Sequence, residues 1–176
     1  MKYKDAIKLS MEEFAKNDKA IFLGYNTKFG NMAGGALSDI PLYKIIETPL
    51  AENLMTGLSI GLSLSGYIPL LYFERFDFIL NGIDAIVNHL DKMKNLSKYQ
   101  YRPKVIIRVV IGGKLKPFFT GPTHTQDFTE SIKKMVDFPI LNPLTSTDII
   151  DAYKFAFQCE ESVMIIENKD YYDIDY

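Results

Sequence analysis

The sequence is poor in the residues that build disulfide frameworks and metal sites. In 176 residues it has one cysteine, Cys159, two histidines, His89 and His124, and no tryptophan. A single cysteine excludes an internal disulfide bond, and two histidines exclude a histidine-rich metal site. The acidic residues also lack the spacing of a carboxylate metal site, so we predict no metal site within this chain.

Long apolar runs and a strong net charge are missing as well. No segment approaches the ~20 consecutive apolar residues that span a bilayer, and residues 1–19 mix charged and apolar positions, unlike a signal peptide. The formal net charge of -2 gives no electrostatic reason to expect a nucleic acid or an anionic membrane as partner. We therefore expect a cytoplasmic protein.

The composition is that of one globular domain. Apolar residues make up 47% of the chain and charged residues 24%, which is ordinary for a globular protein. A chain of 176 residues is long enough for one substantial hydrophobic core and short for two. We therefore predict a single domain over residues 1–176.

Helical and strand patterns alternate along this domain. Helices are predicted at 3–16, 49–65, 76–96 and 146–158, with a further helix ending near residue 136, and strands at 21–24, 43–46, 68–73, 104–111, 139–142 and 163–167. Strands rich in Ile and Val that alternate with helices favour a parallel sheet covered on both faces. The predicted fold is an α/β three-layer sandwich with a mainly parallel central sheet and helices on both faces.

The segment from Glu47 to Gly66 carries the most informative acid. Thr48 suits a helix cap and Pro49 the first helical position, which places Glu52 in the first turn. An acid there also favours the helix dipole, and that structural reading explains most such residues. However, residues 53–73 contain no charged side chain. An acid at the edge of such an apolar block is expected to have a raised pKa, as a group that shares a proton needs.

Several loops are predicted to meet at one edge of the sheet. Ligands of parallel α/β sheets bind beyond the carboxyl ends of the strands, where the predicted loops 24–39, 47–52, 74–78 and 112–125 lie. His124 in the last of these either assists a helix start or carries function, as loops on rigid scaffolds do.

Two further patterns at this edge have structural and functional readings. Phe76 and Phe78 belong to an aromatic cluster that by composition is core, by odds of about two to one, although a ring at a pocket edge also stacks on a flat heterocycle. Gly112 and Gly113, followed by Lys114 and Lys116, are a weak phosphate-binding signal, because the P-loop and dinucleotide patterns are both missing.

Taken in order, these motifs resemble a known family. The segment Glu47-Thr-Pro-Leu-Ala-Glu-Asn-Leu-Met-Thr-Gly-Leu-Ser-Ile-Gly61 is similar to the cofactor-activating segment of the beta subunits of 2-oxo-acid dehydrogenase first components. The tract Phe78-Ile-Leu-Asn-Gly-Ile-Asp-Ala-Ile-Val-Asn88 is similar to another segment of those subunits, whereas Gly121-Pro-Thr-His124 looks closer to transketolase and deoxyxylulose-phosphate synthase. The resemblance extends from about Tyr3 to Tyr171 and implies the pyrimidine-binding domain of a thiamine-diphosphate enzyme.

The resemblance implies a role for each matching residue. Glu52 matches the glutamate that hydrogen-bonds the aminopyrimidine ring of thiamine diphosphate and activates the cofactor. Leu50 matches a residue that lines the ring. Phe78 matches the aromatic residue that stacks on it, with Phe76 as the substitute if the alignment shifts. His124 matches a histidine that faces the substrate.

The resemblance also implies a partner chain. Family members bind the diphosphate through Mg²⁺, which a Gly-Asp-Gly motif in a separate domain holds, and this sequence has no Gly-Asp-Gly. We also expect that the C-terminal domain of the dehydrogenase beta subunits and transketolases is absent. We therefore expect a diphosphate-binding, alpha-like partner subunit that carries the motif and the Mg²⁺, in a hetero-oligomer with two copies of each chain.

The expected reaction makes or breaks a carbon–carbon bond next to the carbonyl of a 2-oxo acid or a ketose phosphate, and the sequence leaves these two substrate classes open. An alternative from another class is a non-catalytic regulatory or scaffolding subunit that keeps the fold. A nucleotide-binding, flavodoxin-like domain ranks last because no phosphate loop is present.

Overall fold

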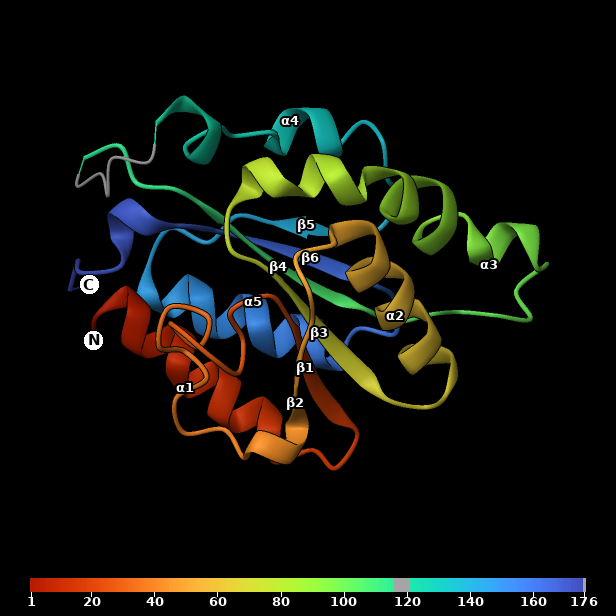
Figure 1. Ribbon diagram of the computed structural model, residues 1–176, viewed down its shortest axis with the longest axis horizontal. Coiled ribbons are helices and arrows are strands. Elements are labelled where there is room, and N and C mark those ends of the chain that lie inside the picture. Colours follow the sequence, from red (N-terminus) through yellow and green to blue (C-terminus); the bar gives the residue numbers. More distant parts are fainter. Residues whose placement is uncertain (116–120, 176) are drawn as a thin grey trace.

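The computed structural model describes residues 1–115 and 121–175 and contains one six-stranded sheet (Figure 1). All strand pairs in it are parallel, in the order β2-β1-β3-β4-β6-β5. The strands are β1 (Ala20–Gly24), β2 (Ile45–Glu47), β3 (Ile68–Phe73), β4 (Ile106–Ile111), β5 (Ile140–Leu141) and β6 (Val163–Asn168). The α-helices are α1 (Tyr3–Ala15), α2 (Glu52–Leu64), α3 (Met93–Leu96), α4 (Thr129–Ile132) and α5 (Ser146–Gln158).

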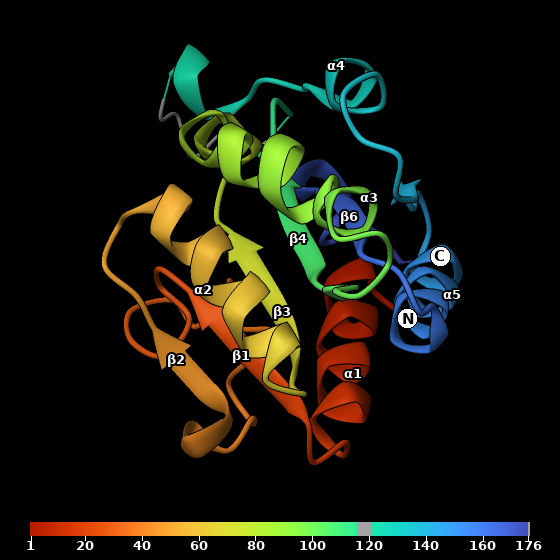
Figure 2. The same cartoon turned by 90° about the vertical axis from the view of Figure 1, so that its right-hand side faces the viewer.

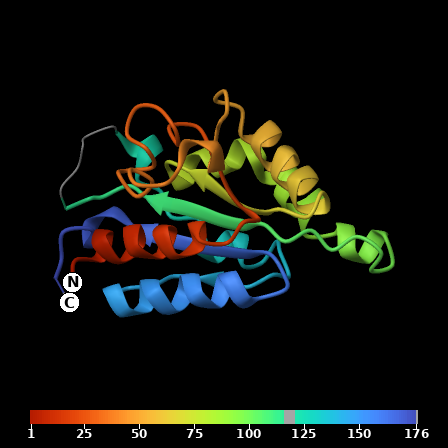
Figure 3. The ribbon, with the colours of Figure 1, turned by 90° about the horizontal axis from the view of Figure 1, so that it is seen from below.

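Helices cover both faces of the sheet. Figure 3 shows α1 and α5 side by side beneath it, and Figure 2 shows α2 and the helical segment that leads to α3 on the opposite face. Each face buries its own apolar cluster, one beneath α1 and α5 and the other beneath α2, the segment 76–90 and α4. The predicted three-layer α/β sandwich is therefore confirmed, with a sheet that is parallel throughout.

The start of α2 differs from the prediction. The helix begins at Glu52, and its N-cap is Ala51, without a side-chain cap. Thr48 instead continues the pairing of β2, because its backbone N–H donates to the Gly24 carbonyl at 3.0 Å. The residue before a proline is biased toward extended backbone, so Thr48 stays on the sheet and the chain turns into the helix three residues later than the capping pattern indicated.

The predicted long helix at 76–96 is three shorter pieces. A 3₁₀ segment spans Phe76–Gly82, a π-helical segment spans Ala85–Leu90, and α3 follows. A Cβ atom at Gly82 would lie 3.1 Å from the Glu52 carbonyl oxygen, so this glycine lets the 3₁₀ segment approach the first turn of α2. π-Helical turns of this kind occur often at functional sites.

A charged pair lies buried on the α1–α5 face of the sheet. Arg108 on β4 makes a bidentate ion pair with Glu167 on β6, with both N···O distances at 2.9 Å. The hydroxyl groups of Tyr153 and Tyr172 each donate to the Glu167 carboxylate at 2.6 Å. The Glu167 carboxylate is therefore fully partnered, as a charge away from water must be.

The N-terminal helix and the C-terminal segment pack against each other. The Tyr3 ring stacks on the Tyr172 ring with 5.9 Å between centroids, and the Tyr3 N–H donates to the Ile174 carbonyl at 3.1 Å. Within residues 1–115 and 121–175, no helix is both long enough and apolar enough to cross a bilayer.

Candidate active site

The loops at the carboxyl ends of β1, β2 and β3 are joined by hydrogen bonds, as predicted. The Glu47 carboxylate at the end of β2 accepts the backbone N–H groups of Asn26, Thr27 and Lys28 at 2.7–2.9 Å. Burial raises the pKa of Glu47, but these N–H donors outweigh burial and hold the pKa below its ordinary value of 4.5. The carboxylate therefore stays ionised and fixes the start of the loop after β1.

A small cavity opens at this edge, and it brings together three of the predicted site residues. Glu52, Leu50 and Phe78 all line it, around a cavity volume of about 10 Å³. The other lining residues are Tyr25, Met55, Tyr72, Phe73 and Glu74. The cavity thus has an aromatic and aliphatic wall with two carboxylates in it.

Glu52 is placed in this cavity as a buried acid without a partner. Its side chain is 7% exposed, because it points inward from the first turn of α2. Among the described residues, no hydrogen bond or ion pair reaches its carboxylate, while its backbone carbonyl accepts from the Thr56 hydroxyl at 2.9 Å. In the described part of the chain, the fully enclosed side-chain atoms without a hydrogen-bond partner are Thr48 Oγ1 and Asp91 Oδ2 and do not include the Glu52 oxygens, so this carboxylate stays open to a ligand that supplies a hydrogen bond.

Phe78 and His124 lie side by side at the rim of the cavity. Their rings meet edge to face, with 5.2 Å between centroids, although His124 follows Phe78 by almost fifty residues in the sequence. The Gln126 side-chain amide also donates to the Asp77 carboxylate at 2.7 Å, which ties the His124 loop to the 3₁₀ segment. His124 does not itself line the cavity, and it reaches the candidate site only through its contact with the Phe78 ring.

Glycine at position 112 is required for this placement of His124. A Cβ atom at Gly112 would lie 1.9 Å from the backbone carbonyl oxygen of His124, which no side chain tolerates. Gly113 makes a similar approach to Asp170, whose carboxylate accepts the backbone N–H of Lys114 at 3.0 Å. These glycines therefore allow close packing of the backbone. Lys116, which belonged to the weak phosphate-binding signal, lies outside the described residues.

Phe76, the substitute candidate for ring stacking, lies outside the cavity. Its side chain is 0% exposed and belongs to the apolar cluster beneath α2. Its ring packs edge to face on Phe128 at 5.8 Å. In a 3₁₀ segment, residues two positions apart point in different directions, so Phe76 faces the core and Phe78 faces the cavity.

The sequence reasoning missed Tyr25 and Glu74. Both immediately follow a strand, Tyr25 after β1 and Glu74 after β3, and that position at a carboxyl end was the available signal. Glu74 is 19% exposed as a side chain and accepts the side-chain amides of Asn31 at 2.9 Å and Asn26 at 3.2 Å.

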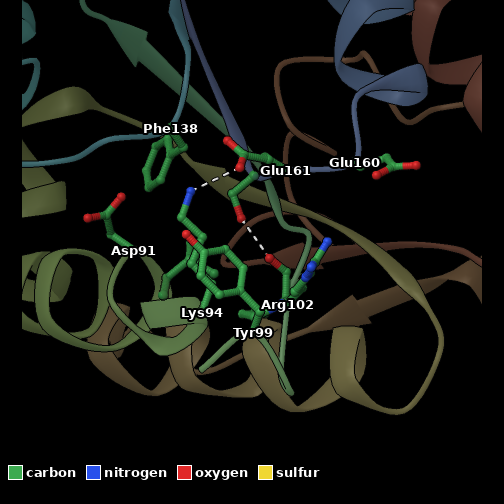
Figure 4. Close-up of a pocket in the computed structure, with 10 residues that line it drawn as sticks. Asp91, Lys94, Tyr99, Arg102, Phe138, Glu160 and Glu161 are labelled. Atoms are coloured by element: carbon green, nitrogen blue, oxygen red, sulfur yellow. Dashed lines mark hydrogen bonds and ion pairs between the residues drawn. The ribbon is translucent and has the colours of Figure 1, made fainter. Parts of the chain in front are cut away.

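A second hollow lies at the opposite edge of the sheet (Figure 4). Two of its lining residues precede strands, Pro103 shortly before β4 and Ser162 directly before β6. Lys94 and Glu161, which also line it, form an ion pair at 2.9 Å. It contains none of the predicted site residues, so we place the candidate site at the Glu52 cavity.

Comparisons with known proteins agree with this architecture, although no protein-family model matches the chain. The chain is 26% identical over 175 residues to the 2-oxoisovalerate dehydrogenase subunit beta of Bacillus subtilis and to the mitochondrial pyruvate dehydrogenase E1 component subunit beta of Saccharomyces cerevisiae. Each match covers 96% of this chain, and 52% and 47% of those proteins. The chain therefore spans about half the length of these relatives.

A solved structure has the same fold. It is described as a split-gene transketolase, an inactive beta4 tetramer, and it superposes with a TM-score of 0.77 at 16% sequence identity. The match covers 99% of this chain and 53% of that chain. The chain is therefore similar in sequence to beta subunits of 2-oxo-acid dehydrogenases, and it has the same fold as the split-gene transketolase chain.

Proposed function

We propose that this chain is the pyrimidine-binding, beta-like subunit of a split thiamine-diphosphate enzyme. The enzyme makes or breaks a carbon–carbon bond next to the carbonyl of a 2-oxo acid or a ketose phosphate. The observation that carries the proposal is the buried Glu52 carboxylate, which faces a cavity without a protein partner. The similarity to dehydrogenase beta subunits supports it.

The residues of the cavity fit the pyrimidine end of the cofactor. An aminopyrimidine is a flat ring with polar nitrogens on its edge, so it needs apolar groups on its faces and a hydrogen-bonding group in its plane. The cavity offers Leu50, Met55 and the Phe78 ring as apolar groups and the Glu52 carboxyl as the polar one. When bound, thiamine diphosphate supplies the electron sink for the carbon–carbon bond chemistry.

Each residue of the chain then has one task. Glu52 holds a proton at a ring nitrogen of the pyrimidine, and its burial keeps water from competing for that proton. Leu50 and Phe78 orient the ring. His124 donates a proton to the substrate or binds its anionic group, from its place against Phe78.

We further propose that a diphosphate-binding, alpha-like subunit covers the cavity and holds Mg²⁺ through a Gly-Asp-Gly motif, in a two-plus-two assembly. The support is the outer face of α2, which begins at Glu52. Leu54 and Leu58 lie exposed on this face, beside Gly57 and Gly61. Exposed apolar surface without charges is typical of interaction sites, and a subunit that grips the other end of the cofactor must dock where the cavity opens.

The first prediction is that Glu52→Gln abolishes turnover and leaves assembly intact. Glutamine has a similar volume but cannot take up the proton, so turnover is expected to fall by about 100-fold or more. The measurement is turnover of the chain purified with its partner, together with the size of the complex. Thiamine diphosphate with Mg²⁺ is expected to bind the pair and not this chain alone.

Glu130→Gln is the matched control, because Glu130 is also an acid in a first helical turn, at α4, and is exposed. Normal turnover of Glu52→Gln would contradict the proposal. If the wild-type pair binds the cofactor without any turnover, the chain is the non-catalytic subunit of the alternative. Comparison of a 2-oxo acid with a ketose phosphate as substrate then decides the substrate class.

A further inference from the structure

The loop after β1 contributes one residue to the Glu52 cavity and has an unusual backbone. Tyr25 at its start lines the cavity. Asn26, Met32 and Ala33 have positive φ angles of 59°, 46° and 55°, although none is a glycine. Such conformations persist only where the surrounding structure holds them, and they occur often at ligand clamps.

Two anchors hold this loop from positions outside the cavity. The Glu47 carboxylate accepts the backbone N–H of Asn26 and of Thr27. The buried Arg108 guanidinium donates to the Ala33 carbonyl at 3.1 Å. Neither anchor residue lines the cavity, so a ligand in the cavity would not touch them.

Glu74 is the third anchor, and it is both part of the cavity wall and bound to the loop. One of its carboxylate oxygens accepts the Asn31 side-chain amide at 2.9 Å, and the other accepts that of Asn26 at 3.2 Å. The Arg75 guanidinium lies 3.9 Å from the same carboxylate. The two amides come from different turns of the loop, so one side chain fixes both.

We propose that Glu74 is a positioning residue that fixes the loop 25–36 through Asn26 and Asn31, and thereby holds Tyr25 in the wall of the cofactor cavity. The inference rests on the proposed function, because it takes the cavity to be the cofactor site. Glu74 acts through Asn26 and Asn31 and takes no part in proton transfer. Cofactor affinity, and not the chemical step, is the quantity that it sets.

The first arm of the test uses the chain without cofactor. In Glu74→Gln, one carboxylate oxygen becomes an N–H₂ donor that faces an amide donor, so the loop loses an anchor. Backbone amides of residues 26–36 are expected to exchange with deuterium about tenfold faster, the effect of losing a hydrogen bond to a charged group. Amides of β4 are expected to be unchanged. Asn31→Ala is also expected to speed the exchange of these loop amides. The double variant Glu74→Gln, Asn31→Ala is expected to add little to either single variant, because both single variants disturb the contact between Glu74 and Asn31.

Asp84→Asn is the matched control, since Asp84 also accepts an asparagine side-chain amide, that of Asn88 at 2.8 Å, at an exposed position outside the cavity. It is expected to leave the exchange of the loop amides unchanged. Unchanged loop exchange in Glu74→Gln would overturn the inference. This arm needs no cofactor, so it can support or contradict the inference even if the proposed function is wrong.

The second arm uses the chain assembled with its partner. The dissociation constant of thiamine diphosphate is expected to rise about tenfold in Glu74→Gln, with kcat at saturating cofactor within about twofold of wild type. A merely structural residue would lower stability without this separation of affinity from kcat. Unchanged cofactor affinity, or a kcat as low as that of Glu52→Gln, would overturn the inference.

Discussion

At the residue scale, the buried pair of Arg108 and Glu167 makes the stability of the chain sensitive to the loss of either partner. Four donor groups converge on one carboxylate: two from the guanidinium and the hydroxyls of Tyr153 and Tyr172. Removing one partner of a buried pair leaves the other charge without compensation. The pair also holds the loop after β1, because Arg108 donates to the Ala33 carbonyl.

We therefore predict that Arg108→Met destabilises the chain by about 3–5 kcal/mol, measured by urea unfolding. The double variant Arg108→Met, Glu167→Leu is expected to cost less than Arg108→Met alone, because it removes the isolated charge as well. A single variant within about 0.5 kcal/mol of wild type would show that the carboxylate is satisfied without the arginine.

Glu47 gives the stability of the chain a dependence on pH. The pKa of its carboxyl is lower in the folded chain than its ordinary value of 4.5. A group with a lowered folded-state pKa contributes its full stabilisation above the unfolded-state pKa and loses it as the pH falls through the folded-state pKa. The loop after β1 thus depends on an ionised Glu47.

We predict that Glu47→Gln flattens the acid side of the stability profile. Between about pH 6 and about pH 3, the wild type is expected to lose more free energy of unfolding than the variant, because only the wild type must protonate this carboxylate. Urea unfolding at a series of pH values measures the difference. Parallel profiles for the two proteins would argue against a role for Glu47.

The residues of the site were partly accessible from the sequence. Glu52 was found because an acid borders a long uncharged block, and Leu50 and Phe78 because the surrounding motif resembles a family. Glu74 was missed because its role depends on Asn31, which a separate loop brings to it. Phe76 and Phe78 differ only in the direction in which each ring points. The sequence could not predict these directions, because the helix has 3 residues per turn here instead of 3.6.

At the element scale, the helices and strands predicted from a regular spacing of apolar residues were correct. Predictions that depended on a local backbone contact were wrong. The helices α1 and α5 and the strand β3 match their predicted ranges within a residue. The start of α2 was wrong because Thr48 pairs with β1, and the segment 76–96 was wrong because Gly82 lets it approach α2. The second deviation brings the backbone of Gly82 close to Glu52, so this departure from local rules lies at the candidate site.

The connection after β4 provides a prediction at this scale. Gly112→Ala places a methyl group against the His124 carbonyl, and the loop has to move away from Phe78. Turnover of the assembled enzyme is expected to fall by about tenfold or more, because catalytic groups need close placement. Cofactor binding through Glu52 is expected to persist.

Gly57→Ala is the matched control for the stability of the chain, because a Cβ atom there has nothing within 4 Å. It is expected to stabilise α2 by about 0.5–1 kcal/mol in urea unfolding. If Gly112→Ala retained full turnover, the His124 carbonyl would have moved without consequence, and the placement of His124 would not matter for activity.

At the scale of the whole molecule, the outer face of α2 stands out as an uncovered apolar surface. Leu54 is 55% exposed, and Leu50, beside the cavity, is 61% exposed. Their positions connect the surface to the cavity opening, because Leu50 lines the cavity just before α2 and Leu54 lies in the first turn of α2. A subunit on this surface would also close the cavity to water.

We predict that Leu54→Lys weakens assembly with the partner subunit by about tenfold or more, since the charge would have to lose its water on docking. The measurement is the dissociation constant of the two subunits by sedimentation. Unfolding of the isolated chain is expected to change by less than about 0.5 kcal/mol, because the side chain is exposed. Unaffected assembly would place the interface elsewhere.

The parallel order of the sheet determines how the cavity is disrupted when the chain unfolds. Its wall combines chain segments that follow β1, β2 and β3, with His124 beyond β4 at the rim. Parallel neighbours are joined only through crossovers, so no contiguous peptide reproduces the wall. Ligand binding to this wall would therefore be lost together with the sheet in one cooperative unfolding transition. A loss of ligand binding would then indicate unfolding of the entire domain and not the fraying of any single helix.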